Sequence, residues 1–297
     1  MKRIMDLKIA VFALTRGYPE DQSLYSSLLT RNESIYNQIN KFRKIPVDVI
    51  LFHEGNINDE DQRHINKNSK DKIIFKNVSQ YFKKENITLD GETKFTLGYR
   101  QMCRFNMYYV WKELSDYDYI LRIDEDILIS KFDPHVFEYM YSKKINYLTG
   151  RFTKDTHTLT NRTLPYFLQA ETDMNVDKVY NHKNPYTNVY ASSVNFWKEY
   201  DVQELLKKIA LSDKQLINRW GDHTVQGLIL NHKKEPIRLF KKLEYNHDSH
   251  SLIIKNNLIR NLTVNSKFNP VSVTGGLFVK FKRWVKNFLK SPNKYDF

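Results

Sequence analysis

The sequence of 297 residues has a single cysteine, Cys103, and no long run of apolar residues. One thiol cannot form an intramolecular disulfide, so the cysteine content favours a reducing compartment over a disulfide-stabilised secreted fold. The apolar segment nearest the start, Ile9 to Leu14, is short and leads directly into polar sequence. It is too short to span a bilayer and lacks the form of a secretory signal, so it predicts a buried strand. We therefore expect a cytoplasmic protein with a soluble body.

Internal repeats, long glycine- and serine-rich linkers and recognised nucleic-acid-binding modules are also missing. Hydrophobic residues make up 41% and charged residues 27% of the chain, which is typical of a globular domain. The formal net charge of +13 indicates an anionic partner, and charge alone leaves nucleic acid, anionic lipid and a diphosphate substrate open. Because the basic residues are spread along the chain, we do not expect nucleic acid to be the partner.

Apolar runs alternate with helical patterns in the first half of the chain, and shorter elements follow in the second half. The patterns predict strands at 8–14, 47–52, 72–75, 117–123, 145–148 and 237–240. They predict helices at 20–41, 95–114, 134–141, 202–210 and 222–230, the last with Asp222 as its N-cap. Such alternation indicates an α/β fold with a mixed, mostly parallel central sheet flanked by helices.

An acidic cluster, Asp124-Glu125-Asp126, directly follows the strand predicted at 117–123. Ligands of open α/β sheets bind beyond the carboxyl ends of strands, and side chains at i and i+2 of an extended segment point the same way. Asp124 and Asp126 therefore suit a divalent cation that binds a nucleotide diphosphate and neutralises charge on the leaving phosphate. Carboxylates suit Mg²⁺ or Mn²⁺, and Mn²⁺ also accepts an imidazole. The alternative is a solvated acidic turn, and the triplet alone does not decide between the two.

Five short motifs are spread along the chain. They are Y-R-Q-M-C-R-F from Tyr99, R-I-D-E-D from Arg122, F-W-K-E-Y-D-V from Phe196, R-W-G-D from Arg219 and Y-N-H from Tyr245. In sequence and order they resemble Y-R-x-M-C-R-F, R-V-E-P-D, F-W-S-N-F-E-I, R-W-G-D and Y-x-H of glycosyltransferase family 15, the fungal-type α-1,2-mannosyltransferases. The likeness spans roughly residues 7–250, and the chain resembles a divergent member without the N-terminal membrane anchor.

The resemblance implies a GT-A-like nucleotide-sugar transferase fold, a GDP-mannose donor, Mn²⁺ (or Mg²⁺) and transfer to a glycan acceptor with retention of configuration. By position in these motifs, Asp124 and His247 match the metal ligands, and Asp201 matches a carboxylate facing the reacting carbon of the sugar. The candidate catalytic residues are thus Asp201, Tyr99 and Asp222, the donor-binding residues Arg122, Asp124, Asp126 and Arg104, and the metal ligands Asp124 and His247.

Four positions depart from the family pattern. Aspartate replaces glutamate at 124 and 201, Glu125 replaces a proline, and Asn195 stands where a histidine is usual. These departures leave the sugar and the acceptor open, so a transferase with another nucleotide-sugar remains an alternative. A non-catalytic transferase-like scaffold and a basic protein that binds phosphate polymers or nucleic acid are further alternatives.

Several site candidates also have a purely structural interpretation. Asp201 can cap the helix predicted at 202–210, and Tyr99 can belong to the core. Arg104 and Arg122 can pair with structural carboxylates or bind a phosphate through two hydrogen bonds. His247 has His250 nearby as a competing ligand.

The C-terminal segment 276–297 predicts a basic amphipathic helix and tail, joined by a connecting segment at 251–275 to a transferase domain at 1–250. At 100° per residue, one face gathers the apolar side chains Phe278, Phe281, Trp284, Val285, Phe288 and Leu289. The opposite face carries Lys282, Arg283, Lys286 and Lys290. Such a helix lies in the lipid headgroup layer, where each basic residue adds about 1 kcal/mol near an anionic surface. We expect peripheral membrane contact through 277–290; the alternative is a helix docked on the domain.

Overall fold

The computed structural model describes residues 6–83, 85–89, 95–172, 174 and 183–247, together with the backbone of two strands at 252–255 and 258–261. The helix predicted at 276–297 lies outside the described residues, so membrane contact through 277–290 stays a prediction. None of the helices in the described part of the chain has the length and apolar character needed to cross a bilayer.

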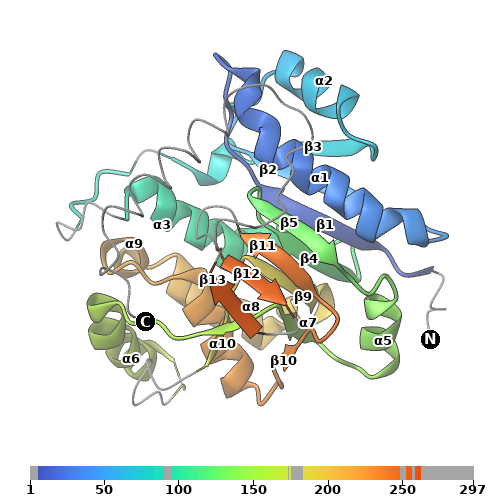
Figure 1. Cartoon of the computed structure of the whole chain (residues 1–297). Helices are drawn as coiled ribbons and strands as arrows, with labels where there is room; N and C mark the ends of the chain where they lie inside the picture. Colours follow the sequence, from blue (N-terminus) through green and yellow to red (C-terminus); the bar gives the residue numbers. More distant parts are fainter. Residues whose placement is uncertain are drawn as a thin grey trace.

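Seven strands form the central sheet, in the order β10-β6-β9-β4-β1-β2-β3 (Figure 1). In chain order they are β1 (Ile9–Leu14), β2 (Asp48–His53), β3 (Ile73–Asn77), β4 (Tyr119–Ile123), β6 (Tyr147–Thr149), β9 (Val189–Ser193) and β10 (Arg238–Leu239). β9 is antiparallel to both of its neighbours, β4 and β6, whereas the other pairings in this sheet are parallel. The predicted mixed, mostly parallel sheet is confirmed.

Helices cover both faces of this sheet (Figure 1). They are α1 (Ser26–Gln38), α2 (Asp59–Lys67), α3 (Leu97–Arg104), α4 (Val110–Glu113), α5 (Val136–Ser142), α6 (Thr158–Glu171), α7 (Val194–Trp197), α8 (Tyr200–Ala210), α9 (Asp213–Ile217) and α10 (Asp222–His232). The helix predicted at 95–114 contains a π-helical turn, Phe105–Tyr109, between α3 and α4.

The central strands are apolar along nearly their whole length because both of their faces are buried. Consecutive residues of β1 point to opposite faces, so Val11 and Phe12 belong to two different core clusters. Phe12 packs in the cluster that includes α3, α8 and α10, and Val11 packs in the cluster that includes α1 and α5. Two cores thus hold the sheet between two layers of helices.

A smaller antiparallel sheet, in the order β13-β12-β11-β5, starts directly after the acidic cluster. Its strands are β5 (Ile127–Lys131), β11 (Glu244–His247), β12 (Leu252–Lys255) and β13 (Leu258–Asn261). β12 and β13 fall within the predicted connecting segment, so the sheet structure of the domain continues past residue 250. A further two-stranded pair joins β7 (Phe152–Thr153) and β8 (Asn184–Pro185).

The order of the parallel strands reverses between β1 and β4. From β1 the chain proceeds outward to β2 and β3, whereas β4 lies on the other side of β1. In doubly wound sheets the carboxyl ends of strands on either side of such a switch point flank a ligand-binding crevice. The acidic cluster follows β4 and therefore lies at this crevice.

Candidate active site

Arg122, in β4, joins two carboxylates at the carboxyl edge of the sheet. Its Nε donates to Oδ1 of Asp124 over 2.7 Å, and its Nη1 donates to Oδ2 of Asp222 over 2.6 Å. The guanidinium is buried, as is the Asp222 side chain. Ion pairs of this kind with low exposure hold their side chains in fixed orientations. Arg122 therefore pairs with carboxylates, which was one of its two interpretations, and both of these carboxylates lie at the crevice.

The prediction that Asp222 is the N-cap of its helix is wrong. Gly221 is the N-cap of α10, and Asp222 is the first helical residue, with its carboxylate turned to Arg122. A carboxylate in the first turn of a helix is stabilised by the positive end of the helix dipole. The Asp222 carboxylate therefore lies in the candidate site, where it pairs with Arg122 and does not cap the helix.

His247 reaches the acidic cluster from β11. β11 pairs with β5, so that His247 lies opposite Ile127, directly after Asp126. The His247 Nε2 lies 3.4 Å from Oδ1 of Asp126, and the histidine is buried. Burial raises the pKa of Asp124 to about 6, with the Arg122 charge opposing and the Asp126 charge adding to the rise. With Arg122, four of the five predicted donor- and metal-binding residues thus converge at the end of β4.

The donor set of Asp124, Asp126 and His247 fits Mn²⁺, which accepts both carboxylate oxygen and imidazole nitrogen. Among the residues that the structure describes, no group of three or more His, Cys, Asp or Glu side chains is arranged to hold a metal ion by itself. A cation at this place would take its remaining ligands from water or from the oxygens of a bound substrate such as a diphosphate.

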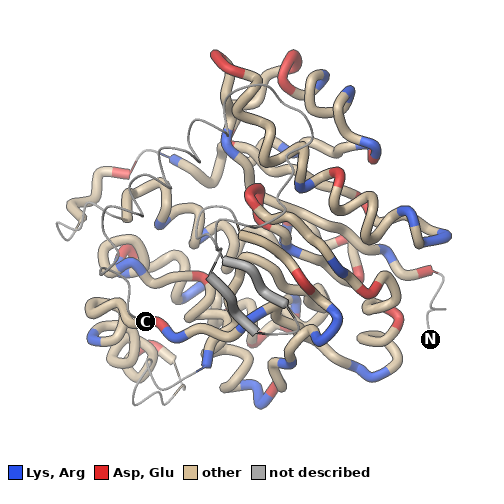
Figure 2. The backbone as a smooth tube through the Cα atoms, in the orientation of Figure 1, with Lys and Arg blue, Asp and Glu red and all other residues tan. Residues whose placement is uncertain are grey.

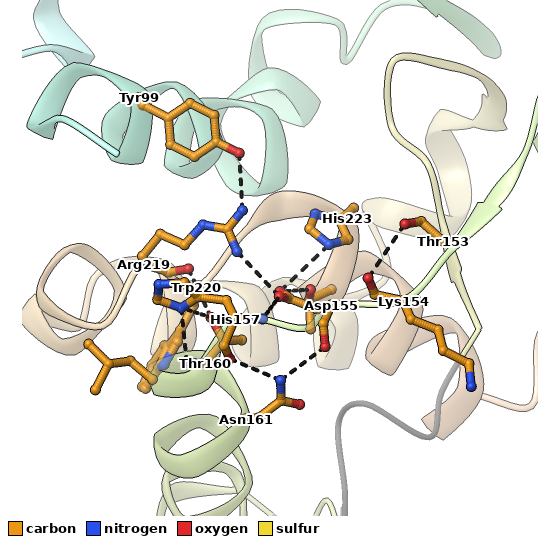
Figure 3. Close-up of polar contacts among 12 residues, drawn as sticks. Tyr99, Thr153, Lys154, Asp155, His157, Thr160, Asn161, Arg219, Trp220 and His223 are labelled. Atoms are coloured by element: carbon orange, nitrogen blue, oxygen red, sulfur yellow. Dashed lines mark hydrogen bonds and ion pairs between the residues drawn. The ribbon is translucent and has the colours of Figure 1, made fainter. Parts of the chain in front are cut away.

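Tyr99, in α3, contacts the same region through Arg219. Figure 3 shows Arg219 between the Tyr99 hydroxyl, 3.4 Å from Nη2, and the Asp155 carboxylate, 3.3 Å from Nη1. The guanidinium carbon also lies 4.1 Å from the centre of the Phe95 ring. Arg219 has a positive φ of 54°, which is uncommon for a residue with a side chain and fits a tightly constrained turn before α10.

Asp155 joins the loop after β7 to the start of α10. Its carboxylate accepts hydrogen bonds from Thr224 Oγ1 at 2.6 Å and from the His157 backbone N–H at 2.9 Å, and His223 Nε2 lies 3.6 Å away. Burial opposes ionisation, but the His223 and Arg219 charges and these hydrogen bonds outweigh it, so the pKa of Asp155 is lowered. An ionised Asp155 thus holds both Arg219 and the first turn of α10.

Asp201 is not brought to this site, which corrects the role predicted for it. It lies in the first turn of α8, its side chain is 58% exposed, and its carboxylate pairs with Lys233. The reason is the direction of β9. Because Ser193, at the end of β9, lies opposite Tyr119, at the start of β4, the chain leaves β9 at the sheet edge remote from Asp124.

The predicted donor-binding residue Arg104 is also held elsewhere. Its Nε donates to Oε1 of Gln215 over 3.1 Å and its Nη1 donates to Oε1 of Glu85 over 2.8 Å. These contacts anchor α3 to α9 and to the segment before α3. Arg104 thus has the structural pairing that was one of its two interpretations.

The opposite end of β9 contributes residues that the sequence did not indicate. Tyr190 lies opposite Arg122 in the strand register, and the Asn188 carbonyl accepts a hydrogen bond from the Asp124 N–H at 3.1 Å. Both residues are buried. Asp155, His223 and these two residues lie in no charged cluster or recognised motif, so no signal in a single sequence marked them. Arg219 was visible in the R-W-G-D motif.

Known proteins share both the sequence pattern and the architecture. No protein-family model matches the chain. Over 170 residues, half of the chain, it is 25% identical to glycolipid 2-alpha-mannosyltransferase 1 of Candida albicans, covering 39% of that protein. Over 173 residues, 51% of the chain, it is 26% identical to the probable mannosyltransferase KTR3 of Saccharomyces cerevisiae, covering 43% of it. Over half of its length the chain is thus similar to two fungal mannosyltransferases.

The GT-A-like fold expected from the sequence is confirmed by a solved structure. Core-mannan synthase A of Aspergillus fumigatus, solved in its Mn/GDP form, superposes with a TM-score of 0.68 at 17% identity. The superposition covers 92% of the present chain and 82% of the other. The sequence matches, by contrast, span only about two fifths of the length of the curated relatives.

Proposed function

We propose that this protein is a retaining glycosyltransferase that transfers α-mannose from GDP-mannose to a glycan acceptor, as an α-1,2-mannosyltransferase does. The observation that carries the proposal is the convergence of Asp124, Asp126 and His247 beside Arg122 at the switch point of the sheet. The names of the sequence relatives and the Mn/GDP form of the A. fumigatus synthase support the choice of donor and cation.

Asp124 and His247 would hold Mn²⁺ (or Mg²⁺), with Asp126 beside them. The cation supplies a positive charge that stabilises the diphosphate as it leaves the sugar. Arg122 keeps the Asp124 carboxylate in place through its 2.7 Å hydrogen bond, so the site has a fixed geometry before the donor binds. The exposed guanidinium of Arg16, at the end of β1, adds a second positive charge at the crevice.

Retention of configuration benefits from a negative charge near the anomeric carbon, where positive charge grows in the transition state. With Asp201 at the remote edge of the sheet, Asp222 is the predicted catalytic carboxylate that the structure brings to the site. We assign the stabilising role to Asp222 and a positioning role to Tyr99, which is linked to α10 through Arg219.

The proposal predicts metal-dependent turnover of GDP-mannose with Mn²⁺, and a product that keeps the α configuration of the donor when analysed by NMR. The Asp124→Asn protein should lose turnover by roughly 100-fold or more, because the charge that holds the cation is removed. Asp48→Asn is the matched control, since Asp48 accepts a 2.8 Å hydrogen bond from Tyr117 at the amino end of β2. Full activity of the Asp124→Asn protein, or a β-linked product, would contradict the proposal.

Two other outcomes of the same experiment decide between the alternatives. Turnover of a different nucleotide-sugar would keep the reaction class and change the donor. Binding of GDP and Mn²⁺ without any turnover would identify a non-catalytic relative. In the view of Figure 2, the lysines and arginines of the described residues are spread over several elements, which supports a transferase over a nucleic-acid-binding protein.

We further propose that the protein acts in the cytoplasm as a peripheral membrane protein. The single cysteine supports the reducing compartment, and the amphipathic pattern of 277–290 supports the membrane contact. A transferase that uses a membrane-assembled glycan gains from such an attachment because its acceptor lies in the same plane.

A further inference from the structure

Glu125 ties together the ends of two strands on either side of the switch point. Its Oε2 accepts hydrogen bonds from Thr15 Oγ1 at 2.7 Å and from the Arg16 backbone N–H at 3.0 Å. Its Oε1 accepts a hydrogen bond from Arg16 Nε at 2.8 Å. Thr15 and Arg16 follow β1, and Glu125 follows β4, so one carboxylate joins both walls of the crevice.

The loop that carries Arg16 is fixed from a second side as well. A Cβ on Gly17 would lie only 1.8 Å from the backbone oxygen of Asn56, so this position accepts only glycine. The next residue, Tyr18, donates its backbone N–H to the Tyr25 hydroxyl at 2.8 Å. The backbone around Arg16 is thus held by close contact with the loop after β2 and by Glu125.

Glu125 and Arg16 differ in the solvent exposure of their side chains. The Glu125 side chain is 15% exposed, whereas the Arg16 side chain is 76% exposed although its Nε is held. Glu125 raises the pKa of Arg16, which keeps the guanidinium charged. Because an arginine has five N–H donors, the bond from Nε leaves the outer nitrogens of the fork able to bind a phosphate.

We propose that Glu125 is a positioning residue for the nucleotide donor, which holds the Arg16 guanidinium at the switch-point crevice so that it binds the diphosphate beside the metal site. The inference rests on the proposed nucleotide-sugar donor. A proline, which the family pattern has at this position, lacks a carboxylate and cannot accept these hydrogen bonds.

The physical effect of the clamp is to order a long side chain before the donor arrives. Immobilising a flexible side chain at a binding interface lowers affinity, and a side chain that is already ordered avoids this cost. We therefore expect Glu125→Gln to weaken binding of GDP in the presence of Mn²⁺ by about 3- to 10-fold. The KM for the donor should rise by a similar factor, with kcat little changed, because the lost contact stabilises bound donor and transition state alike.

A double-mutant cycle on the full chain tests whether Glu125 acts through Arg16. The dissociation constant of GDP with Mn²⁺ is measured by calorimetry for the wild type, Glu125→Gln, Arg16→Ala and the double variant. If Glu125 acts through Arg16, Glu125→Gln causes no further loss in the Arg16→Ala background, so the two effects are strongly non-additive. A purely structural role of Glu125 would give the same loss of affinity in both backgrounds.

Glu138→Gln is the matched control. Glu138 forms the corresponding ion pair with Arg43, with Oε1 3.0 Å from Nη2, and Arg43 lies between α1 and the start of β2, at the opposite edge of the sheet. The GDP affinity of the Glu138→Gln protein should equal that of the wild type. Unchanged GDP affinity in Glu125→Gln, or additive losses in the cycle, would overturn the clamp and leave the proposed function standing. A wild-type protein that binds no GDP with Mn²⁺ would overturn both.

Discussion

Arg122 organises the site at the scale of single residues. Its two short ion pairs fix Asp124, which follows the same strand, relative to Asp222, which is separated from it by almost 100 positions in the chain. A buried arginine that bridges two carboxylates compensates the mutual repulsion of their charges. The same arrangement leaves Asp201 outside, paired with Lys233 on the surface.

The contrast between Asp201 and Asp222 gives a prediction at this scale. Asp201→Asn removes a surface ion pair of an exposed side chain, which contributes roughly 0–1 kcal/mol to the free energy of unfolding, so turnover should stay within about twofold of the wild type. Asp222→Asn removes the charge opposite Arg122 and should lower kcat by roughly 100-fold. Steady-state kinetics of both variants decides the assignment. A large loss of kcat in Asp201→Asn would restore the role that its sequence motif predicts.

At the scale of elements, the start of α10 connects the site to the rest of the domain. The helix is preceded by the constrained turn at Arg219 and Gly221, and its first turn carries Asp222, His223 and Thr224. Asp155 binds this turn from the loop after β7. The direction in which Asp222 faces thus depends on a contact between segments that lie far apart in the sequence.

Asp155→Asn tests this contact by its effect on stability. The change removes the negative charge beside Arg219 and should lower the free energy of unfolding by about 1–3 kcal/mol. Since the pKa of Asp155 is lowered in the folded protein, its contribution is fully present above the usual aspartate value of about 3.9 and is lost as the pH falls through the folded value. In denaturant unfolding, the free energy of unfolding of Asp155→Asn should therefore lie below that of the wild type by a constant amount between pH 7 and pH 5. The difference should become smaller below about pH 4.

Asp133→Asn is the control for this measurement, because Asp133 accepts a 2.8 Å hydrogen bond from the Lys242 ammonium, whose side chain is 70% exposed. It should cost less than about 1 kcal/mol. If Asp155→Asn were no more destabilising than Asp133→Asn, the anchoring role of Asp155 would have to be abandoned.

At the scale of the whole molecule, the GT-A-like domain gathers the candidate donor-binding residues at one edge of the sheet, and we propose that the C-terminal segment adds a membrane contact. Full-length protein should sediment with anionic liposomes at moderate salt, and a version that ends at Thr274 should remain in the supernatant with its donor hydrolysis intact. Vesicles of neutral lipid should retain much less of the full-length protein, because each basic residue contributes about 1 kcal/mol only near an anionic surface. Equal sedimentation of both versions would support a helix docked on the domain.

Much of the fold follows from local patterns in the sequence. The apolar runs of β1, β2 and β4 predict buried parallel strands because their composition suits elements covered on both faces. The acidic cluster after β4 indicates the ligand-binding edge, because ligands bind at the carboxyl ends of parallel strands. The motif order indicates the resemblance to mannosyltransferases, and with it the candidate site residues Asp124, Asp222 and His247.

Strand order and direction, in contrast, depend on tertiary contacts that no local pattern contains. The antiparallel insertion of β9 between β4 and β6 sends Asp201 to the remote edge and brings Asn188 and Tyr190 to the site. The clamp from Glu125 to Arg16 joins residues 109 positions apart, and Asp155 meets Arg219 across 64 positions of the chain. The sequence alone therefore determined the layers and the edge at which ligands bind, because these depend on short-range periodicity. Only the tertiary structure decided which charged side chains meet there, because that depends on the pairing of distant strands.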